Sequence, residues 1–127
     1  MKLRIHDNSI RLRLTRSEVG RFASDGAIES VFEFGPGSGQ RLRYALEAAS
    51  TETMVVCVSQ GKITIEVPRV IAREWCEGDR VGISARQDLG GEKQLDILVE
   101  KEFRRLHGAK FDPDLYPNPL EPKNLQC

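Results

Sequence analysis

The chain has 127 residues, 39% of them hydrophobic and 30% charged, a composition typical of one folded domain rather than a disordered chain. Its 19 basic and 19 acidic side chains cancel, which excludes a strong global attraction to nucleic acid or membranes but leaves room for a local patch. No stretch approaches the roughly 20 apolar residues of a membrane span, and Lys2 and Arg4 interrupt any apolar leader.

Polar and apolar side chains alternate along residues 9–14, and this pattern predicts a half-buried strand. Thr15 and Glu18 then have the spacing of a capping box, in which each side chain satisfies a backbone group at the start of a helix. We expect this helix to run to about Ser24 and to end near Gly26, which tolerates positive φ.

A hairpin should follow the first helix. Residues 28–34 form the first predicted strand, and residues 41–48 form its partner. Between them the glycine-rich string Gly35-Pro36-Gly37-Ser38-Gly39 predicts a turn.

The second half repeats this order. Residues 55–58 and 62–67 are predicted strands joined by a Gln60-Gly61 turn, and Pro68 precedes a helix over 69–77. Trp75 lies at helical spacing within an apolar stripe and is therefore expected in the core. Residues 81–87 and 94–100 complete a second predicted hairpin.

The two halves look like copies separated by 53 residues (67 − 14). Apolar positions coincide at this offset: Ile10, Leu12 and Leu14 with Ile63, Ile65 and Val67; Phe22 with Trp75; Ile28 with Val81; Leu42, Tyr44 and Leu46 with Leu95, Ile97 and Val99.

This pattern predicts a mainly β fold with two short helices, a small barrel built from two pseudo-repeated units around a pseudo-twofold axis. We expect one domain over residues 1–107, with repeats of about 1–50 and 54–103, and an extended proline-rich tail over 108–127.

Two strings resemble the AbrB/MazE swapped-hairpin family: Ile63-Thr64-Ile65-Glu66-Val67-Pro68 and Glu77-Gly78-Asp79-Arg80-Val81. In that family hairpins of two chains interleave into one barrel that binds DNA, which implies a fused pseudo-dimer here. The first copy is similar, with Asn8-Ser9 before its strand. It departs from the family pattern at Thr15, which replaces the proline, and at Asp25-Gly26-Ala27-Ile28, which replaces Gly-Asp-x-Val.

Nearly the whole chain also resembles a family of small, uncharacterised bacterial proteins with no assigned activity. The residues that carry this likeness are Lys2-Leu3-Arg4-Ile5, Asn8 through Thr15, Ser17-Glu18-Val19, Val99-Glu100-Lys101-Glu102-Phe103 and Tyr116-Pro117-Asn118-Pro119. Members carry a cysteine where Arg105 stands and an acidic run of which only Asp112 and Asp114 remain, which argues against a metal role.

Exterior arginines of the first repeat are the leading binding candidates. Arg11 and Arg13 share one face of their strand, because residues two apart on a strand point the same way. Arg41 and Arg43 do so on theirs. If these strands are neighbours, four guanidinium groups gather in an arrangement suited to phosphate or carboxylate. The DNA-binding resemblance implies phosphate contacts for Arg11, Arg13 and Arg16. The alternative is a solvated face paired with Glu29, Glu33 and Glu47.

Metal and catalytic sites have little support. Two groups could supply ligands, His107 with Asp112 and Asp114, and His6 with Asp7, yet neither has a second histidine at ligand spacing. The glycine-rich turn matches neither a nucleophile elbow nor a phosphate loop. We therefore expect no metal, no cofactor and no enzymatic activity.

The sequence leaves three functions open. The leading one is a non-catalytic bacterial binding module, AbrB- or antitoxin-like, that contacts DNA or a protein partner through the first-repeat arginines. The second is a protein–protein interaction or structural protein with no nucleic-acid role. The third is a small-ligand or metal-dependent enzyme. We expect a cytoplasmic monomer or weak homo-oligomer, with no membrane contact and with Tyr116 docking on its own chain or another.

Overall fold

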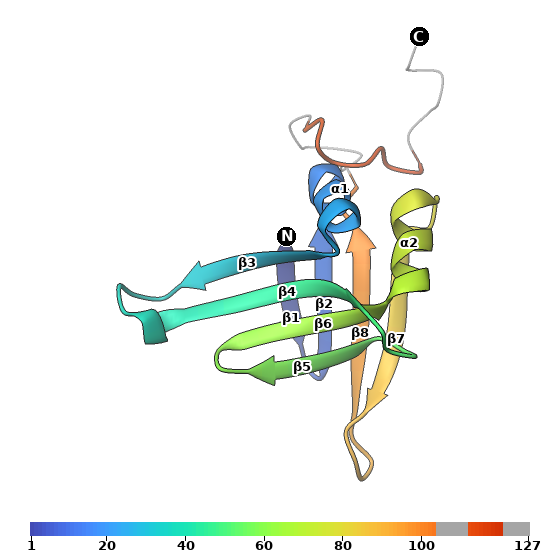
Figure 1. Ribbon diagram of the computed structural model, residues 1–127. Helices are drawn as coiled ribbons and strands as arrows, with labels where there is room; N and C mark the ends of the chain where they lie inside the picture. The colour runs from blue at the N-terminus through green and yellow to red at the C-terminus, as the bar shows by residue number, and fades with distance from the viewer. Residues whose placement is uncertain (104–111, 121–127) are drawn as a thin grey trace.

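The computed structural model describes residues 1–103 and 112–120, and within them two four-stranded sheets and two helices (Figure 1). Sheet A has the strand order β1-β2-β8-β7, from β1 (Lys2–His6), β2 (Ser9–Leu14), β7 (Gly82–Asp88) and β8 (Gln94–Lys101). Sheet B has the order β3-β4-β6-β5, from β3 (Ala27–Glu33), β4 (Arg41–Ala49), β5 (Val55–Ser59) and β6 (Lys62–Pro68). The helices are α1 (Arg16–Asp25) and α2 (Arg69–Glu77), and a 3-10 turn, η1 (Ser38–Gln40), precedes β4.

The mainly β fold with two short helices is confirmed, but the predicted barrel is wrong. The two sheets stay open and cross each other face to face, with the helices at one end (Figure 1). At the corner between β5 and β7, the Gln87 side chain accepts a hydrogen bond from the backbone N–H of Val56 (2.8 Å). A side chain thus occupies the place where a strand ladder would have to continue for the barrel to close.

Each sheet combines two strands of one repeat with two strands of the other. In sheet A, β1 and β2 come from the first repeat and β7 and β8 from the second. In sheet B, β3 and β4 come from the first repeat and β5 and β6 from the second. Within each sheet the hairpin pairs are antiparallel, whereas the central pairs that join the repeats, β2 with β8 and β4 with β6, are parallel. The repeats are therefore interleaved, as a pseudo-dimer requires.

The offset of 53 residues holds for the strand register. Ile10 lies opposite Ile97 in sheet A, and the equivalent residues Ile63 and Tyr44 lie opposite each other in sheet B. The offset fails at one predicted pair. Ile28 corresponds to the buried Ile83 rather than to Val81, which is exposed, because the connection after α2 is longer than the one after α1.

Helix α1 is capped as its sequence predicts, and the two helices pack through their predicted core residues. Glu18 accepts a hydrogen bond from the N–H of Thr15 (2.9 Å), and Gly26 ends α1 with φ of 77°. The equivalent residues Phe22 and Trp75 are both buried and meet edge to face, with ring centroids 6.3 Å apart. Because equivalent residues of a twofold arrangement touch only near its axis, this contact marks the pseudo-twofold axis between the helices.

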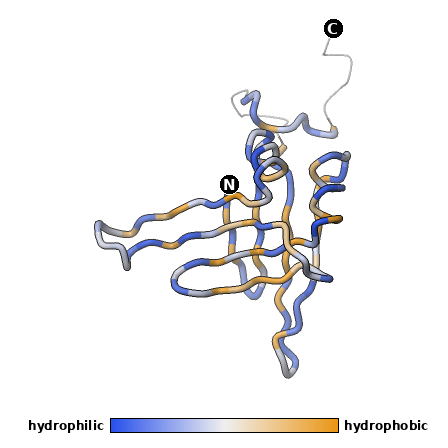
Figure 2. Tube along the Cα trace, in the orientation of Figure 1, coloured by the Kyte–Doolittle hydropathy of each residue, from blue (hydrophilic) through white to orange (hydrophobic). Residues whose placement is uncertain are grey.

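The core fills the space between the inner faces of the two sheets. Apolar residues alternate with polar ones along the central strands (Figure 2), and the apolar set points inward. Its members include Leu12, Leu14, Leu46, Ile65, Val67, Ile97 and Val99. Neither of the described helices is long and apolar enough to cross a membrane. The predicted domain boundary at residue 107 lies outside the described residues.

Two alanine substitutions in α1 should have opposite effects on stability. Gly20 lies in the exposed middle of the helix and Gly26 in its left-handed C-cap, and a Cβ at either position would contact nothing within 4 Å. Gly20→Ala should raise the free energy of unfolding by about 0.8 kcal/mol through helix propensity. Gly26→Ala should lower it by about 1 kcal/mol through backbone strain. Urea denaturation checks both, and a stabilising Gly26→Ala would contradict the assignment of the cap.

Candidate functional site

The outer face of sheet A, turned away from the core, gathers cationic side chains from two strands. Residues directly opposite each other on paired strands share a face. The register places Lys2 opposite Arg13 and Arg4 opposite Arg11 in the β1–β2 hairpin. The hairpin therefore presents four cations within two adjacent cross-strand pairs.

These four cations line a hollow of about 380 Å³ on the protein surface. We call it the cationic hollow, and its lining residues are Lys2, Leu3, Arg4, Arg11 and Arg13. Among the described residues no carboxylate lines it, so an anion that entered would contact only positively charged side chains. Lys2 also makes an ion pair with Glu102 at the hollow's edge.

Glu100, on the neighbouring strand β8, holds two of the arginines in place. Its Oε1 lies 2.7 Å from Nε of Arg13 and 3.6 Å from Nε of Arg11. Within the part of the chain that the structure describes, no hydrogen bond involves the terminal nitrogens of these two guanidinium groups. Those nitrogens form the fork that recognises phosphate or carboxylate, and they remain available to a ligand.

The other predicted pair of arginines lies on the other sheet. Arg41 and Arg43 belong to β4, whose neighbours are β3 and β6, so the condition that the two arginine strands pair is not met. Arg41 pairs with Glu33 at 3.9 Å, and Arg43 lies opposite Lys62. Four guanidinium groups therefore do not converge: Arg11 and Arg13 lie on the outer face of sheet A, and Arg41 and Arg43 lie on sheet B.

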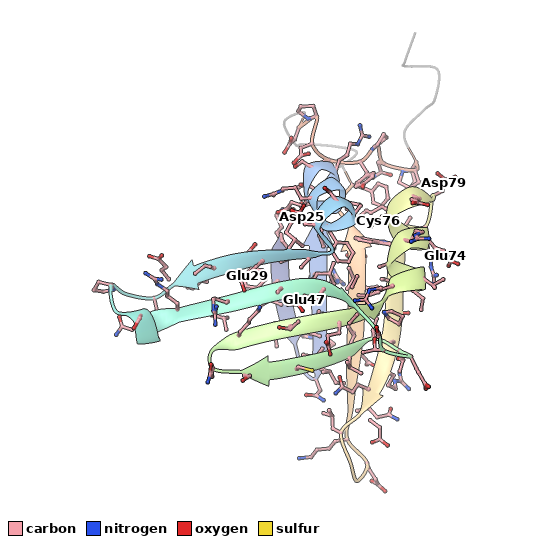
Figure 3. All side chains as sticks on the ribbon, in the orientation of Figure 1. Asp25, Glu29, Glu47, Glu74, Cys76 and Asp79 are labelled. Atoms are coloured by element: carbon pink, nitrogen blue, oxygen red, sulfur yellow. The ribbon has the colours of Figure 1, made fainter. Side chains whose placement is uncertain are left out.

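Sheet B has a more acidic outer face than sheet A. Glu29 on β3 and Glu47 on β4 lie close together on it (Figure 3), and Lys62 pairs with both, at 3.1 and 3.4 Å. The predicted solvated, glutamate-paired face describes sheet B well. On sheet A the partner of Arg11 and Arg13 is Glu100, a residue that the sequence interpretation did not propose.

Arg16 is not among the residues that line the cationic hollow, and it contacts the C-terminal part of the described chain. Residues 112–120, which we call the strap, cross the start of α1, and the N–H of Arg16 donates to the Asp114 carbonyl (2.8 Å). Its guanidinium lies 5.4 Å from the centre of the Tyr116 ring. The predicted docking of Tyr116 thus occurs within its own chain, beside Phe103, with ring centroids 5.7 Å apart.

Asp114 fastens the strap to the first turn of α1. Its carboxylate accepts hydrogen bonds from the N–H of Ser17 (2.9 Å) and from the Ser17 hydroxyl (2.8 Å). The Ser17 N–H bond is the main reason that the pKa of Asp114 is lowered from its usual 3.8.

Lys101 is buried beneath the strap rather than being part of the outer face. Its Nζ donates to the Gly78 carbonyl (2.9 Å) and lies 5.8 Å from the Trp75 ring centre and 5.4 Å from that of Tyr116. Burial lowers the pKa of Lys101. Its contacts are therefore those of a structural clamp between α2, β8 and the strap.

Lys2 and Arg4 are the site residues that sequence interpretation missed, because it did not predict β1. The available signal was the alternation in Lys2-Leu3-Arg4-Ile5-His6 followed by an Asp7-Asn8 turn. The same offset of 53 residues maps β1 onto β5 and Asp7 onto Gln60. Both of these turn residues have positive φ.

Metal-ligating groups do not cluster in the described part of the chain. His6 lies 3.3 Å from Asp7 on an exposed turn. The other histidine considered, His107, lies outside the described residues.

Fold and site together define a small, internally duplicated, mainly β protein with one cationic sheet face. A family model, the family of unknown function DUF7009, matches residues 1–120, and the chain belongs to that family. Comparison with curated proteins and with solved structures gave no significant match. The expected membership of an uncharacterised family is thus confirmed, and the likeness to AbrB/MazE proteins stays a prediction.

The strap should detach at low pH. Because the pKa of Asp114 is lowered on docking, its contribution is complete above about 3.8 and is lost as pH falls through the docked-state pKa. Hydrogen-exchange protection of the Tyr116 amide, which donates to the Glu102 carbonyl, reports docking. Asp114→Asn should lower this protection already at neutral pH.

Asp25→Asn, which removes a carboxylate from the opposite end of α1, is the matched control and should leave the Tyr116 amide protected. Equal protection in wild type and Asp114→Asn at neutral pH would show that the carboxylate does not hold the strap.

Proposed function

We propose that this protein is a non-catalytic binding module that holds an anionic macromolecule, with duplex DNA as the leading partner, against the cationic hollow. The observation that carries the proposal is a hollow lined by Lys2, Arg4, Arg11 and Arg13 and, within the described part of the chain, by no carboxylate. Phosphate contacts from arginine and lysine supply most of the affinity of such interfaces.

Rigid placement of the cations supports binding rather than simple solvation. The two arginines project from a central strand of sheet A, and Glu100 constrains both guanidinium groups. A preorganised arginine loses less side-chain entropy when it binds an anion than a free surface arginine does.

Because the chain as a whole is neutral, we expect the affinity for an anionic partner to come from the local charge of the cationic hollow. The chain carries equal numbers of acidic and basic groups, so long-range steering contributes little. If all four cations of the hollow contact phosphates, the logarithm of the binding constant should fall with the logarithm of salt concentration with a slope of about −3.6.

Substituting the two arginine pairs separately tests the site. Arg11→Ala/Arg13→Ala should weaken binding to a fluorescent DNA duplex by roughly tenfold and reduce the salt slope by about 2. Arg41→Ala/Arg43→Ala changes the net charge equally but alters only sheet B, and it should leave the affinity nearly unchanged. Fluorescence anisotropy over a salt series measures both quantities.

No DNA binding by the wild type at about 50 mM salt would exclude the nucleic-acid version of the proposal. Equal losses from the two double variants would show a non-specific charge effect rather than a site in the hollow.

Neutralising Glu100 should have the opposite effect on binding. Glu100→Gln removes the carboxylate beside Arg11 and Arg13 while keeping its shape, so the potential at the hollow becomes more positive. DNA affinity should rise severalfold at low salt, and stability should fall by about 0.5–1 kcal/mol because two partly exposed ion pairs are lost. Asp96→Asn, which releases the more exposed Arg86, is the control. Weaker DNA binding by Glu100→Gln would mean that arginine placement matters more than charge.

A protein–protein role without nucleic acid is the second candidate, and the β3–β4 hairpin favours it. This hairpin projects beyond the rest of the molecule (Figure 1) and carries Phe32 and Phe34, which are 55% and 70% exposed with ring centroids 4.7 Å apart. An exposed aromatic pair of this kind is typical of an interaction surface.

A further inference from the structure

The two sheets leave four edge strands, and two of these have opposite charge. β1 carries Lys2, Arg4 and His6 and no acidic residue, whereas β3 carries Glu29 and Glu33 and no basic residue. The remaining edges differ, since β5 is uncharged and β7 has one arginine and one aspartate. Among the described strands, β1 and β3 are therefore the two edges that each carry charge of one sign and that complement each other.

Both edges also leave apolar side chains uncovered on the core-facing side. Ile5 on β1 is 62% exposed, and Phe32 on β3 is 55% exposed with Phe34 just beyond it. Their faces follow from the register, because Ile5 lies opposite the buried Ile10 and Phe32 follows the inward alternation of Ile28. The inner faces of both sheets thus continue past the core that they share.

The β3–β4 hairpin of sheet B overhangs the core, on the side of the molecule where β1 forms the edge of sheet A (Figure 1). In the hydropathy view the projecting hairpin contains apolar segments far from the crossing point of the sheets (Figure 2). Any strand added to β1 would lengthen sheet A beneath this overhang and cover it.

We propose that the chain self-associates by pairing β1 of one copy with β3 of another, antiparallel, with Arg4 opposite Glu33 and Ile5 opposite Phe32. In this register the charged residues share the outer face and the apolar residues share the inner face, as in the sheets themselves. Leu3 falls opposite Phe34, so the exposed aromatic pair is buried.

Within the described part of one copy, neither Arg4 nor Glu33 is held by a close ion pair, so both side chains are available for such a contact. Among the described residues Arg4 has no ion-pair partner, and Glu33 reaches Arg41 only at 3.9 Å. Pairing of like edges, β1 with β1 or β3 with β3, would instead bring together charges of the same sign. Charge therefore favours the unlike pairing over the pairing of like edges.

The contact joins different surfaces of the two copies, so it can close into a dimer with two such contacts or continue into longer assemblies. It does not depend on the proposed function, because neither Glu33 nor Phe32 lines the cationic hollow. Arg4 belongs to both surfaces, and assembly would occupy part of the hollow.

Charge reversal tests the pairing by sedimentation velocity over a wide concentration range at about 50 mM salt. The wild type should show an average mass that rises above the 14.3 kDa of one chain as concentration increases. Arg4→Glu and Glu33→Arg should each weaken association at least tenfold. An equimolar mixture of the two variants should associate as the wild type does, because both contacts between unlike variants again pair opposite charges.

Arg73→Glu and Glu74→Arg, which reverse exposed charges on α2, are the matched controls and should associate as the wild type does. Circular dichroism establishes that each variant is folded, and Phe32→Ser provides an uncharged test of the same contact. A wild type that stays monomeric throughout the concentration range would overturn the proposal. Failure of the mixed variants to associate would overturn it too.

Discussion

Parallel pairing between strands of different repeats is the constraint on which the rest of this structure depends. β2 pairs with β8, and β4 pairs with β6, so neither repeat can complete a sheet from its own strands. Parallel neighbours require a long connection. Residues 50–61, which include β5, connect β4 to β6, and residues 15–93 separate β2 from β8. Folding of either repeat is therefore coupled to folding of the other, and the Phe22–Trp75 contact lies where their helices meet.

The duplication also explains how one face became a candidate site while its counterpart did not. The β1–β2 and β5–β6 hairpins are equivalent at an offset of 53 residues, yet the first presents Lys2, Arg4, Arg11 and Arg13 on its outer face. The second presents Cys57, Thr64, Lys62 and Glu66 among its outer residues. Backbone symmetry has been kept because the core requires it, whereas the solvent face has been free to diverge.

Sequence interpretation was accurate where one local rule governed each element. The capping box of Thr15, the left-handed Gly26 and the alternation of residues 9–14 each depend on near neighbours, and each is confirmed. It failed where strands had to be placed in space. Arg41 and Arg43 alternate as Arg11 and Arg13 do, but alternation gives only the face of a strand and not the sheet to which the strand belongs. Because β1 was not predicted, Lys2 and Arg4 were not recognised as site residues.

The sequence by itself determined the repeat, the mainly β composition, the two helices and a core that includes Trp75. It could do so because the spacing of apolar residues along each element, and its recurrence 53 residues later, shows which side of the element is buried. Only the tertiary structure decided that the sheets stay open, which strands of the two repeats pair with each other, and that the cations of β1 join those of β2. These outcomes depend on pairing between strands distant in sequence. Such pairing leaves no local pattern, since the same alternating strand can satisfy its hydrogen bonds against several partners.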